Sequence, residues 1–458
     1  MSYCLAIDIG ASSGRHILGK LNNGILETEE IYRFENGFKE ENGTLVWDIE
    51  LLTENVINGI KECKKIDKIP QTVAIDTWGV DYVLMDSKGH EILPCVSYRD
   101  SRTTNAVDEV FSIISKETLY EKTGIQTQSF NTIFQLYCDK KSGKLDKAKR
   151  LLMIPEYLSF RLTGVMKNEY TNATTTGLVN AKTKEIDAEI CERLGIEKAL
   201  FGQLKMPSTF IGNFTKEIEE KVGFNAKVVF APSHDTASAV AACPIDENCA
   251  FISSGTWSLV GTENLFPVTS KEAMKANFSN EGGIEYRFRF LKNIMGMWLF
   301  QNIRKNLNMK YTYDEMMHLA MESKYDKLID PTDDAFLAPA NMIEAIRDYL
   351  CEPELTIGDV LKSVYISLAD NYKNTIEEIE AVAGKNIECI AIVGGGSKDA
   401  YLNKLTREFT GKRVMVGLTE GTAVGNLIAQ LMFTDETLTL QKAREIIKNT
   451  FSIKEVTV

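Results

Sequence analysis

Residues 8–15 read Asp-Ile-Gly-Ala-Ser-Ser-Gly-Arg and combine residue types that can bind a phosphate and its metal ion. In a turn of small residues, the backbone N–H groups can approach an anion closely, and the serine hydroxyls and Arg15 add further donors. Asp8 ends an apolar run, where its carboxylate could hold the cation that accompanies phosphates. An ordinary Gly/Ser hairpin explains the same residues, so this segment alone leaves both interpretations open.

Two later segments repeat this chemistry. Residues 253–261, Ser-Ser-Gly-Thr-Trp-Ser-Leu-Val-Gly, form a second small-residue turn, and two such turns would hold a polyphosphate from both sides. Residues 394–399, Gly-Gly-Gly-Ser-Lys-Asp, follow an apolar run and could admit a phosphate or a flat ring close to the backbone. A plain turn between a strand and a capped helix is the alternative for the third segment.

Asp235 is the candidate general base. It follows an apolar strand and begins an Ala/Ser-rich stretch that is typical of a helix. The positive end of a helix keeps a carboxylate ionised at neutral pH, as a general base requires. The alternative role for Asp235 is an ordinary helix N-cap. His234 is either a ligand contact or a residue with hydrogen bonds inside the protein.

Several other enzyme classes are excluded or disfavoured. The sequence contains neither G-x-x-x-x-G-K-[ST] nor G-x-G-x-x-G, so it has no P-loop or dinucleotide-binding fingerprint. Residues 10–14 match the G-x-S-x-G of hydrolases, but that motif requires a helix directly after the serine. Here a hairpin signal follows at Asn22-Asn23-Gly24. The adjacent residues 233–235 do not make a Ser-His-Asp triad, whose members meet in space.

The first half of the chain predicts a mixed sheet with helices. Asn22-Asn23-Gly24 separates two strands of a hairpin, and Asp48 opens an amphipathic helix. A pure parallel sheet does not fit this order of elements. The expected strands are 4–9, 17–21, 25–34, 73–75 and 82–85.

A second half begins near residue 245, because the unit of strand, Ser/Gly turn and strand recurs at 250–262. Residues 100–225 are expected to be mostly helical, with a strand at 228–231 before Asp235. A long helix face over 360–379 is closed by Gly384. We therefore expect two domains, 1–245 and 246–458. The further strands expected in the second half are 250–252, 257–260 and 387–393.

Composition limits the partners. The 458 residues hold 52 Lys and Arg against 64 Asp and Glu, a net charge of −12, which disfavours nucleic acid or an anionic membrane as the main partner. Nine scattered cysteines without a Cys-x-x-Cys pair predict reduced thiols in a cytoplasmic protein, not a disulfide framework or a zinc site. Neither a secretory signal nor a run of about 18 apolar residues is found.

These segments together resemble the FGGY carbohydrate kinases of the actin-like ATPase superfamily, and within them the branch that acts on L-rhamnulose. The Arg-Glu pair that grips glycerol in glycerol kinases is absent at residues 77–80, so glycerol is not the expected substrate. The segments that carry the resemblance span nearly the whole chain: 8–15, 46–48, 75–83, 98–103, 169–176, 233–240, 253–259, 280–283, 291–301 and 392–396.

The resemblance implies an α/β fold of two actin-like (ribonuclease H-like) domains, each a mixed five-stranded sheet flanked by helices, with a cleft between them. It implies ATP-dependent phosphorylation of the 1-hydroxyl of L-rhamnulose, with Mg²⁺, in a cytoplasmic monomer or homodimer that binds only small molecules. A kinase for another ketose, such as L-fuculose or L-xylulose, is the near alternative. A non-catalytic sugar or nucleotide sensor on this fold is the alternative from another class.

The resemblance also assigns roles. Asp235 takes the hydroxyl proton, and Asp8 reaches the Mg²⁺ ion. The residues expected to hold ATP are Ala11, Ser12, Ser13, Gly14, Arg15, Thr256, Gln301, Gly394, Gly395 and Gly396. Those expected to contact the sugar are Gly79, His234, Thr236 and Asn293.

Overall fold

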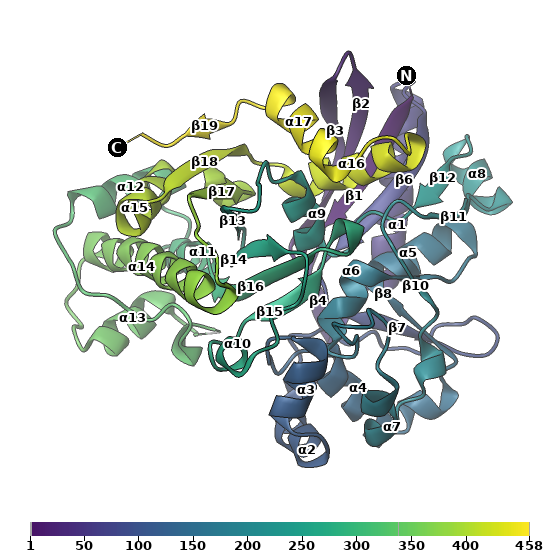
Figure 1. The fold of residues 1–458 in the computed structure, drawn as a ribbon, viewed down its shortest axis with the longest axis horizontal. Coiled ribbons are helices and arrows are strands. Elements are labelled where there is room, and N and C mark those ends of the chain that lie inside the picture. Colours follow the sequence, from purple (N-terminus) through teal and green to yellow (C-terminus); the bar gives the residue numbers. More distant parts are fainter. Residues whose placement is uncertain (1, 338, 458) are drawn as a thin grey trace. The chain divides into compact units, whose positions relative to one another are not determined.

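The computed structural model of the chain describes residues 2–337 and 339–457 (Figure 1). The chain divides into two compact units. Unit 1 consists of Met1–Ala242, Asn264–Phe290 and Gly421–Thr450. Unit 2 consists of Cys243–Glu263, Leu291–Glu420 and Phe451–Val458. Each unit is therefore built from segments that are far apart in the sequence.

A three-stranded antiparallel meander begins the sheet of unit 1. Strands β1 (Tyr3–Ile9), β2 (Ser13–Asn22) and β3 (Ile25–Glu35) pair in that order (Figure 1). Asn23 and Gly24 have φ values of 50° and 80° in the turn between β2 and β3. Because Asn and Gly tolerate positive φ better than other residues, they make this tight turn. The predicted hairpin is confirmed.

The other half of this sheet is largely parallel. Strand β6 (Pro70–Thr77) lies parallel to β1, and β12 (Lys227–Val229) lies parallel to β6, while β11 (Phe210–Asn213) is antiparallel to β12. The sheet order is β11-β12-β6-β1-β2-β3. The strand expected at 228–231 ends two residues early, because the chain then turns toward helix α9 (Asp235–Ala242).

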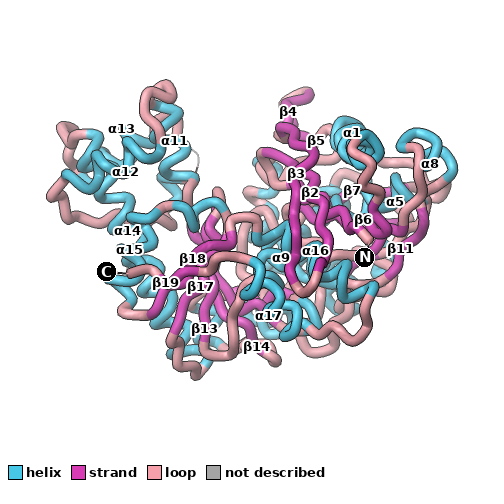
Figure 2. The backbone as a smooth tube through the Cα atoms, turned by 90° about the horizontal axis from the view of Figure 1, so that it is seen from above, coloured by secondary structure: helices cyan, strands magenta, loops and turns pink. Residues whose placement is uncertain are grey.

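Helices cover this sheet. Helix α1 (Ile49–Lys65) begins as predicted, since the Asp48 carboxylate accepts the Leu51 N–H at 3.0 Å. Helix α16 (Gly421–Thr434) packs against α9, β1 and β6 (Figures 1 and 2). The contact of α16 with α9 is very close, because a Cβ on Gly425 would lie 1.8 Å from the carbonyl oxygen of Ser238. A late segment of the chain thus supports the helix that starts at Asp235.

Smaller elements complete unit 1. Strand β7 (Tyr82–Met85) was expected to lie with the main sheet, but it pairs antiparallel with β8 (Arg150–Met153) in a separate sheet. The chain reaches β7 through the tight segment at Gly79, which turns it away from β6. The remaining strands are β4 (Phe38–Glu41), β5 (Thr44–Trp47), β9 (Asn168–Glu169), β10 (Leu204–Lys205) and β15 (Ser279–Gly282), and β15 is an edge strand of the second main sheet, next to β16. The remaining α-helices are α2 (Ala106–Ile113), α3 (Lys116–Thr123), α4 (Thr132–Lys141), α5 (Ile154–Thr163), α6 (Tyr170–Ala173), α7 (Ala188–Leu194), α8 (Lys216–Val222), α10 (Lys271–Lys275) and α17 (Leu440–Thr450).

Unit 2 contains the second main sheet. Strand β13 (Cys249–Ser254) pairs antiparallel with β14 (Trp257–Asn264) and parallel with β17 (Cys389–Val393), and β18 (Arg413–Leu418) lies parallel to β17. Strand β16 (Phe288–Met295) adjoins β14, and β19 (Lys454–Glu455) adjoins β18. The α-helices are α11 (Trp298–Asn306), α12 (Tyr313–Glu322), α13 (Met342–Leu350), α14 (Ile357–Ala383) and α15 (Ala400–Thr410). Gly384 ends α14 with φ 65°, as predicted.

The two sheets repeat one strand order. The series β3-β2-β1-β6-β12 corresponds to β16-β14-β13-β17-β18, with a hairpin first and two further parallel strands next. The predicted α/β class with mixed sheets is confirmed. The predicted number of five strands describes this shared core only, because edge strands extend the first sheet to six and the second to seven.

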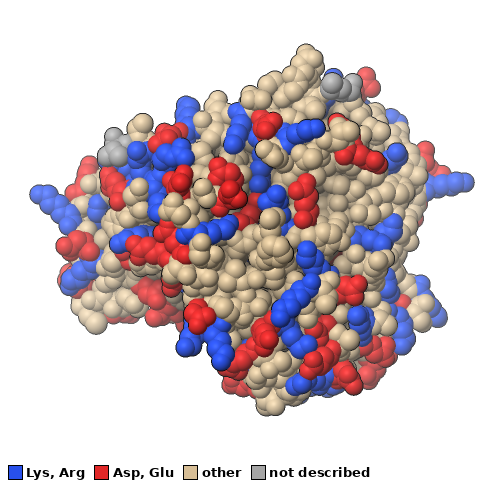
Figure 3. All heavy atoms as spheres, in the orientation of Figure 1, with Lys and Arg blue, Asp and Glu red and all other residues tan. Residues whose placement is uncertain are grey.

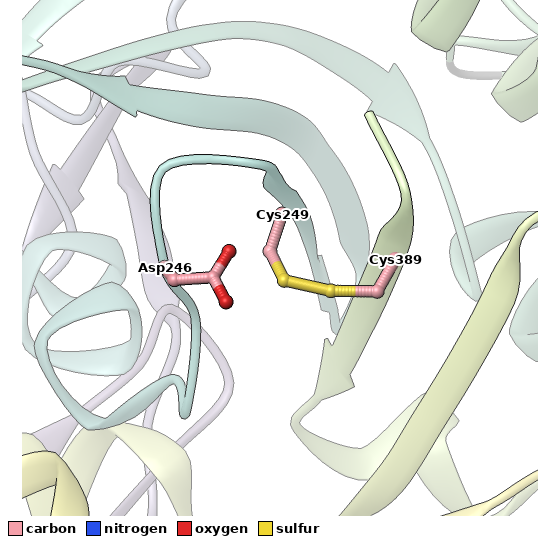
Figure 4. A group of neighbouring side chains, drawn as sticks. All are labelled: Asp246, Cys249 and Cys389. Atoms are coloured by element: carbon pink, nitrogen blue, oxygen red, sulfur yellow. A yellow bond between two sulfur atoms is a disulfide. The ribbon is translucent and has the colours of Figure 1, made fainter. Parts of the chain in front are cut away.

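One prediction about the cysteines is wrong. Cys249 and Cys389 form a disulfide in unit 2, and the other seven cysteines are not in disulfide bonds (Figure 4). The pair lies in register on β13 and β17 with Cα atoms 4.8 Å apart, although 140 residues separate the two cysteines in the sequence. The carboxylate of Asp246 lies beside the bond. Since both sulfurs are bonded to each other, neither is a thiolate ligand.

The surface carries both signs of charge. Basic and acidic side chains are interspersed on the face in Figure 3. Within residues 2–337 and 339–457, no helix is long and apolar enough to cross a lipid bilayer.

Candidate active site

The turn between β1 and β2 is the first candidate phosphate site. Gly10 N–H donates to the Ser13 carbonyl at 2.9 Å, and this bond closes the turn. The Asn36 amide donates to the Gly10 carbonyl at 2.8 Å and holds the turn from outside. Ser12 is exposed, while Gly14 is buried against Phe34, where a Cβ would lie 2.2 Å from the ring. A side chain at position 14 would therefore displace the Phe34 ring, whether or not the turn binds a ligand.

Carboxylates gather beside this turn. Asp8 is buried at the end of β1, and its Oδ2 lies 2.9 Å from Arg15 Nε. Asp76 occupies the register position next to Asp8 on the parallel strand β6. Burial, and then the negative charges of Asp8 and Asp235, raise the pKa of Asp76 well above its usual range, although the amide of Asn426 opposes this shift. Asp8 and Asp235, expected to serve the metal ion and the proton transfer, thus both lie close to Asp76.

The segment after β6 has a strained backbone. Val80 has φ 68°, an unusual value for a β-branched residue. Three side chains hold it: Thr175 accepts the Val80 N–H at 3.1 Å, and Thr132 and Gln135 donate to the Val80 carbonyl at 2.7 and 3.3 Å. Gly79 precedes it, and a Cβ there would lie 3.1 Å from the side chain of Thr175. Such strain is maintained where the surrounding structure fixes a functional backbone.

The loop before α9 is anchored by buried polar side chains. Glu169 accepts the hydroxyl of Ser233 at 2.6 Å and its N–H at 3.2 Å. The amide of Asn172 donates to the Ser233 carbonyl at 3.2 Å, and Thr77 N–H donates to the same carbonyl at 2.9 Å. Ser233 is thus fixed on both sides, and it carries His234 and Asp235 next to the end of β6.

Asp235 is placed as a usable base. Its carboxylate Oδ1 accepts the Thr236 N–H at 2.6 Å and the Thr236 hydroxyl at 3.1 Å. About a third of its side chain, 32%, is exposed, whereas His234 and Thr236 are buried. One carboxylate oxygen is held by the start of the helix, and the group remains accessible to a substrate. Asp235 is the first residue of α9, and its place at the helix start leaves the carboxylate accessible, so this place does not exclude a role as a base.

Sequence reasoning missed two charged residues beside His234. Glu281 on β15 and Arg289 on β16 are buried, and Arg289 Nη1 lies 3.1 Å from Glu281 Oε2. Burial opposes ionisation of Glu281, but Arg289 and His234 outweigh it and lower the pKa of Glu281 to about 2. Glu281 belongs to the Asn-Glu-Gly-Gly segment that the sequence singles out, whereas no local pattern marks Arg289.

The candidate phosphate turn of unit 2 lies against helix α11. Gly255 N–H donates to the Trp257 carbonyl at 2.9 Å and closes the turn between β13 and β14. The Thr256 carbonyl accepts the N–H groups of Gly296 and Trp298 at 3.2 and 3.1 Å, at the beginning of α11. This helix carries the half-buried Gln301, so Thr256 and Gln301 come from segments in direct contact.

The glycine segment 394–396 packs on the same turn. Gly394 has φ 86°, and its Cβ would lie 2.7 Å from the Ser254 carbonyl oxygen, while a Cβ on Gly396 would lie 2.0 Å from the Ser254 hydroxyl. Only glycine fits at both positions. The expected tight turn is the start of a short 3-10 helix, Gly395–Lys398, that leads into α15. Gly395 is exposed with open space at its Cβ position.

The structure distributes the predicted residues over both units. Unit 1 holds residues 8, 11–15, 79 and 234–236, around the ends of β1 and β6 and the start of α9. Unit 2 holds the half-buried Asn293 on β16, together with Thr256, Gln301 and residues 394–396. Within each unit, the glycine turns follow strands at the centre of the sheet, as in proteins that bind phosphates at strand ends.

Two sheets of one strand order, with glycine turns and a supported carboxylate, define a phosphotransferase-like architecture. Comparison with known families agrees. Residues 3–242 match the N-terminal domain of the FGGY family of carbohydrate kinases, and residues 250–433 match its C-terminal domain. The chain belongs to the FGGY family of carbohydrate kinases.

Curated relatives align over nearly their full length. A protein of Oceanobacillus iheyensis named rhamnulokinase is 46% identical over 99% of this chain and 98% of its own. Rhamnulokinases of Halalkalibacterium halodurans and Bacillus subtilis are 45% and 40% identical, over 99% of this chain and over 98% and 94% of their own. These relatives therefore align with both halves of the chain.

Solved structures share the fold at low identity. A ligand-bound xylulose kinase from Lactobacillus acidophilus gives a TM-score of 0.83 at 17% identity, covering 99% of this chain and 93% of that chain. A Plasmodium falciparum glycerol kinase with ADP gives a TM-score of 0.79 at 14% identity, covering 99% and 94%. At this identity the likeness concerns the fold.

Proposed function

We propose that the chain is an ATP-dependent kinase that phosphorylates the 1-hydroxyl of L-rhamnulose, giving L-rhamnulose 1-phosphate and ADP. The relatives named rhamnulokinase, at 40–46% identity over nearly the whole chain, support this substrate. The observation that carries the chemistry is the partly exposed carboxylate of Asp235, held at the start of α9. It lies close to Asp76, the register neighbour of Asp8.

Asp235 acts as the general base. It takes the proton of the 1-hydroxyl while the sugar oxygen forms a bond to the γ-phosphorus. The bond from that phosphorus to the bridging oxygen of ADP breaks in line, and ADP leaves. Because the transition state is loose, positioning and charge neutralisation contribute most of the rate. Thr236 contributes by holding Oδ1 of Asp235, which leaves Oδ2 to face the hydroxyl.

The sugar contacts follow from the segments around Asp235. His234 and Thr236 flank the base, and we propose that both contact the ketose, with Asn293 as a further contact. A Cβ on Gly79 would lie 3.1 Å from the side chain of Thr175, and we propose that the absence of a side chain at position 79 leaves room for the sugar. The strained conformation of Val80 fixes this backbone in place.

The nucleotide contacts come from the glycine turns. We propose that residues 11–15 and Thr256 bind the β- and γ-phosphates, and that Gln301 and residues 394–396 flank the nucleoside. Oxygen ligands suit Mg²⁺, and buried Asp8, with the unpartnered Oδ1 of Asp76 on the neighbouring strand, fits this metal. When bound, Mg²⁺ would neutralise phosphate charge. Asp8 would hold it, directly or through water.

We also propose the division of the chain at residue 245, which falls between the two matched family domains. ATP and a phosphorylated sugar product are both cytoplasmic metabolites, so we propose that the chain acts there. Its partners are then the ketose and ATP, and the protein is a monomer or a homodimer.

A coupled ADP-release assay tests the function. Purified protein with MgATP is offered L-rhamnulose, L-fuculose, L-xylulose and glycerol at equal concentrations, and a reaction without sugar serves as the control. We expect the highest kcat/KM with L-rhamnulose. A higher value with another ketose would reassign the substrate, and ADP release that is independent of sugar would contradict the kinase. Binding of sugar without any turnover would support a sensor.

A further inference from the structure

The ring of His234 lies between groups of opposite charge. Its Nε2 is 3.4 Å from Oδ1 of Asp235. Its Nδ1 is 3.2 Å from Nη2 of Arg289 and 3.3 Å from Oε2 of Glu281. His234 and Glu281 are buried, and Arg289 has no exposed surface. Three charged side chains therefore surround the ring, which is largely shielded from bulk water.

Arg289 restricts which ring nitrogen carries the proton. A guanidinium group can only donate hydrogen bonds, so Nη2 approaches Nδ1 favourably only when Nδ1 has a free lone pair. The proton of a neutral imidazole is then on Nε2. From there it points to the carboxylate of Asp235, which can only accept. In this arrangement the contacts of the ring with Arg289 and with Asp235 are both satisfied.

Glu281 is the competitor for the same nitrogen. Its carboxylate would accept a proton from Nδ1 if Arg289 were absent. In the structure, Oε2 of Glu281 is 3.1 Å from Nη1 of Arg289, and Oε1 accepts the Ser279 hydroxyl at 3.4 Å. Arg289 Nε also donates to the Gly282 carbonyl at 3.0 Å, which fixes the plane of the guanidinium. Glu281 is thus engaged by Arg289, and the ion pair orients Nη2 of Arg289 toward His234.

The geometry points to Arg289 as a positioning residue that keeps Nδ1 of His234 unprotonated. The Nε2 proton of His234 then holds Oδ1 of Asp235 and leaves the other carboxylate oxygen for the substrate hydroxyl. A proton on Nδ1 would either leave the Nε2 lone pair facing the carboxylate or create an imidazolium beside it. Either state weakens Asp235 as a base. The expected effect on the reaction rate rests on the proposed function, whereas the protonation of Nδ1 does not depend on it.

Two variants break the same buried ion pair, but only one of them removes the hydrogen-bond donor to Nδ1 of His234. Arg289→Met removes the donor, so Glu281 can accept a proton from Nδ1. Glu281→Gln keeps Arg289 and its donor. We expect Arg289→Met to lower kcat about 10- to 100-fold with little change in the KM for ATP, and Glu281→Gln, which retains the donor, to lower kcat by a clearly smaller factor. A merely structural ion pair would make the two losses equal.

Nitrogen NMR of the histidine rings reads the protonation directly. The chain has only four histidines, at 16, 90, 234 and 318, and the signals lost in His234→Gln identify the ring. At neutral pH we expect an unprotonated Nδ1 in the unaltered protein and in Glu281→Gln, and a protonated Nδ1 in Arg289→Met. Thermal unfolding shows whether each variant folds. If Arg289→Met does not fold, Arg289→Lys is used in its place, because lysine keeps the charge of the ion pair but lacks the second terminal nitrogen of the guanidinium group.

The kinetic and NMR experiments distinguish the proposed function from the proposed role of Arg289. Equal losses of kcat in Arg289→Met and Glu281→Gln, or an unprotonated Nδ1 without Arg289, would overturn the inference. The spectra are recorded without sugar or nucleotide. If the unaltered protein phosphorylates no ketose, the proposed function fails, while the spectra still decide whether Arg289 sets the state of His234.

Discussion

The Asp235→Asn substitution removes one charge at the proposed base and preserves its shape. The asparagine Oδ1 can still accept the Thr236 N–H and hydroxyl, which lie at 2.6 and 3.1 Å from the carboxylate. With 32% of the side chain exposed, the variant leaves no buried group without its partner, and α9 begins as before. We therefore expect a loss of chemistry with little loss of stability.

The magnitude follows from the role of a general base. Positioned acid–base groups contribute about 100- to 10,000-fold, so kcat should fall by this factor, or about 3 to 5 kcal/mol on the activation barrier. The KM for ATP should change little, because the residues proposed to hold the nucleotide lie on other segments. Steady-state ADP release with saturating L-rhamnulose and varied ATP measures both quantities.

A matched control tests whether any such Asp→Asn change has this effect. Asp435 is exposed, and its Oδ1 accepts the Thr437 N–H at 2.9 Å and hydroxyl at 2.7 Å, the same pattern as at Asp235. Asp435→Asn should retain full kcat. Turnover of Asp235→Asn within a few-fold of the unaltered protein would refute the assignment of Asp235, and so would an equal loss in both variants.

Three further predictions concern the fold. Burial lowers the pKa of His16 from 6.5 to about 4, so between these pH values the unfolded chain binds the proton more readily than the folded protein, and stability falls as the pH drops. Relative to His16→Gln, the unaltered protein should lose about 2 kcal/mol of unfolding free energy between pH 7 and pH 5, measured by urea unfolding. Parallel plots of stability against pH for the two proteins would contradict this. In Gly425→Ala the new Cβ would lie 1.8 Å from a backbone carbonyl oxygen of α9, so the free energy of unfolding should fall by about 1 to 3 kcal/mol. Gly37→Ala is the neutral control, because its Cβ would have no atom within 4 Å. Thiol titration in denaturant should count seven cysteines before reduction and nine after it, and nine at the start would exclude the bond between Cys249 and Cys389.

Short-range signals predicted much of the fold. The Asn22-Asn23-Gly24 turn, the Asp48 cap and the glycine that ends α14 lie where the sequence placed them, because each depends on backbone preferences over a few residues. The departure of β7 from the main sheet could not be predicted. It depends on the strained backbone at Val80, which hydrogen bonds from distant side chains maintain.

Some residues of the candidate site could likewise be predicted from the sequence, and others could not. Its turns and Asp235 stand next to apolar strands and are visible as patterns of small and acidic residues. No such pattern marks Arg289, and the segment that contains Glu281 does not reveal its contact with His234, because both contacts join segments about 50 residues apart. A buried arginine resembles any surface arginine in the sequence, and only its burial and partners distinguish it.

The sequence by itself determined the family, the glycine turns, the candidate base and most strands, since these depend on residue type and near neighbours. The tertiary structure decided which distant segments meet. It brought α16 back into unit 1 against α9, paired Cys249 with Cys389 across β13 and β17, and set an ion pair beside His234. The physical reason is that local preferences act over a few residues, whereas packing and the pairing of buried charges depend on the whole folded chain.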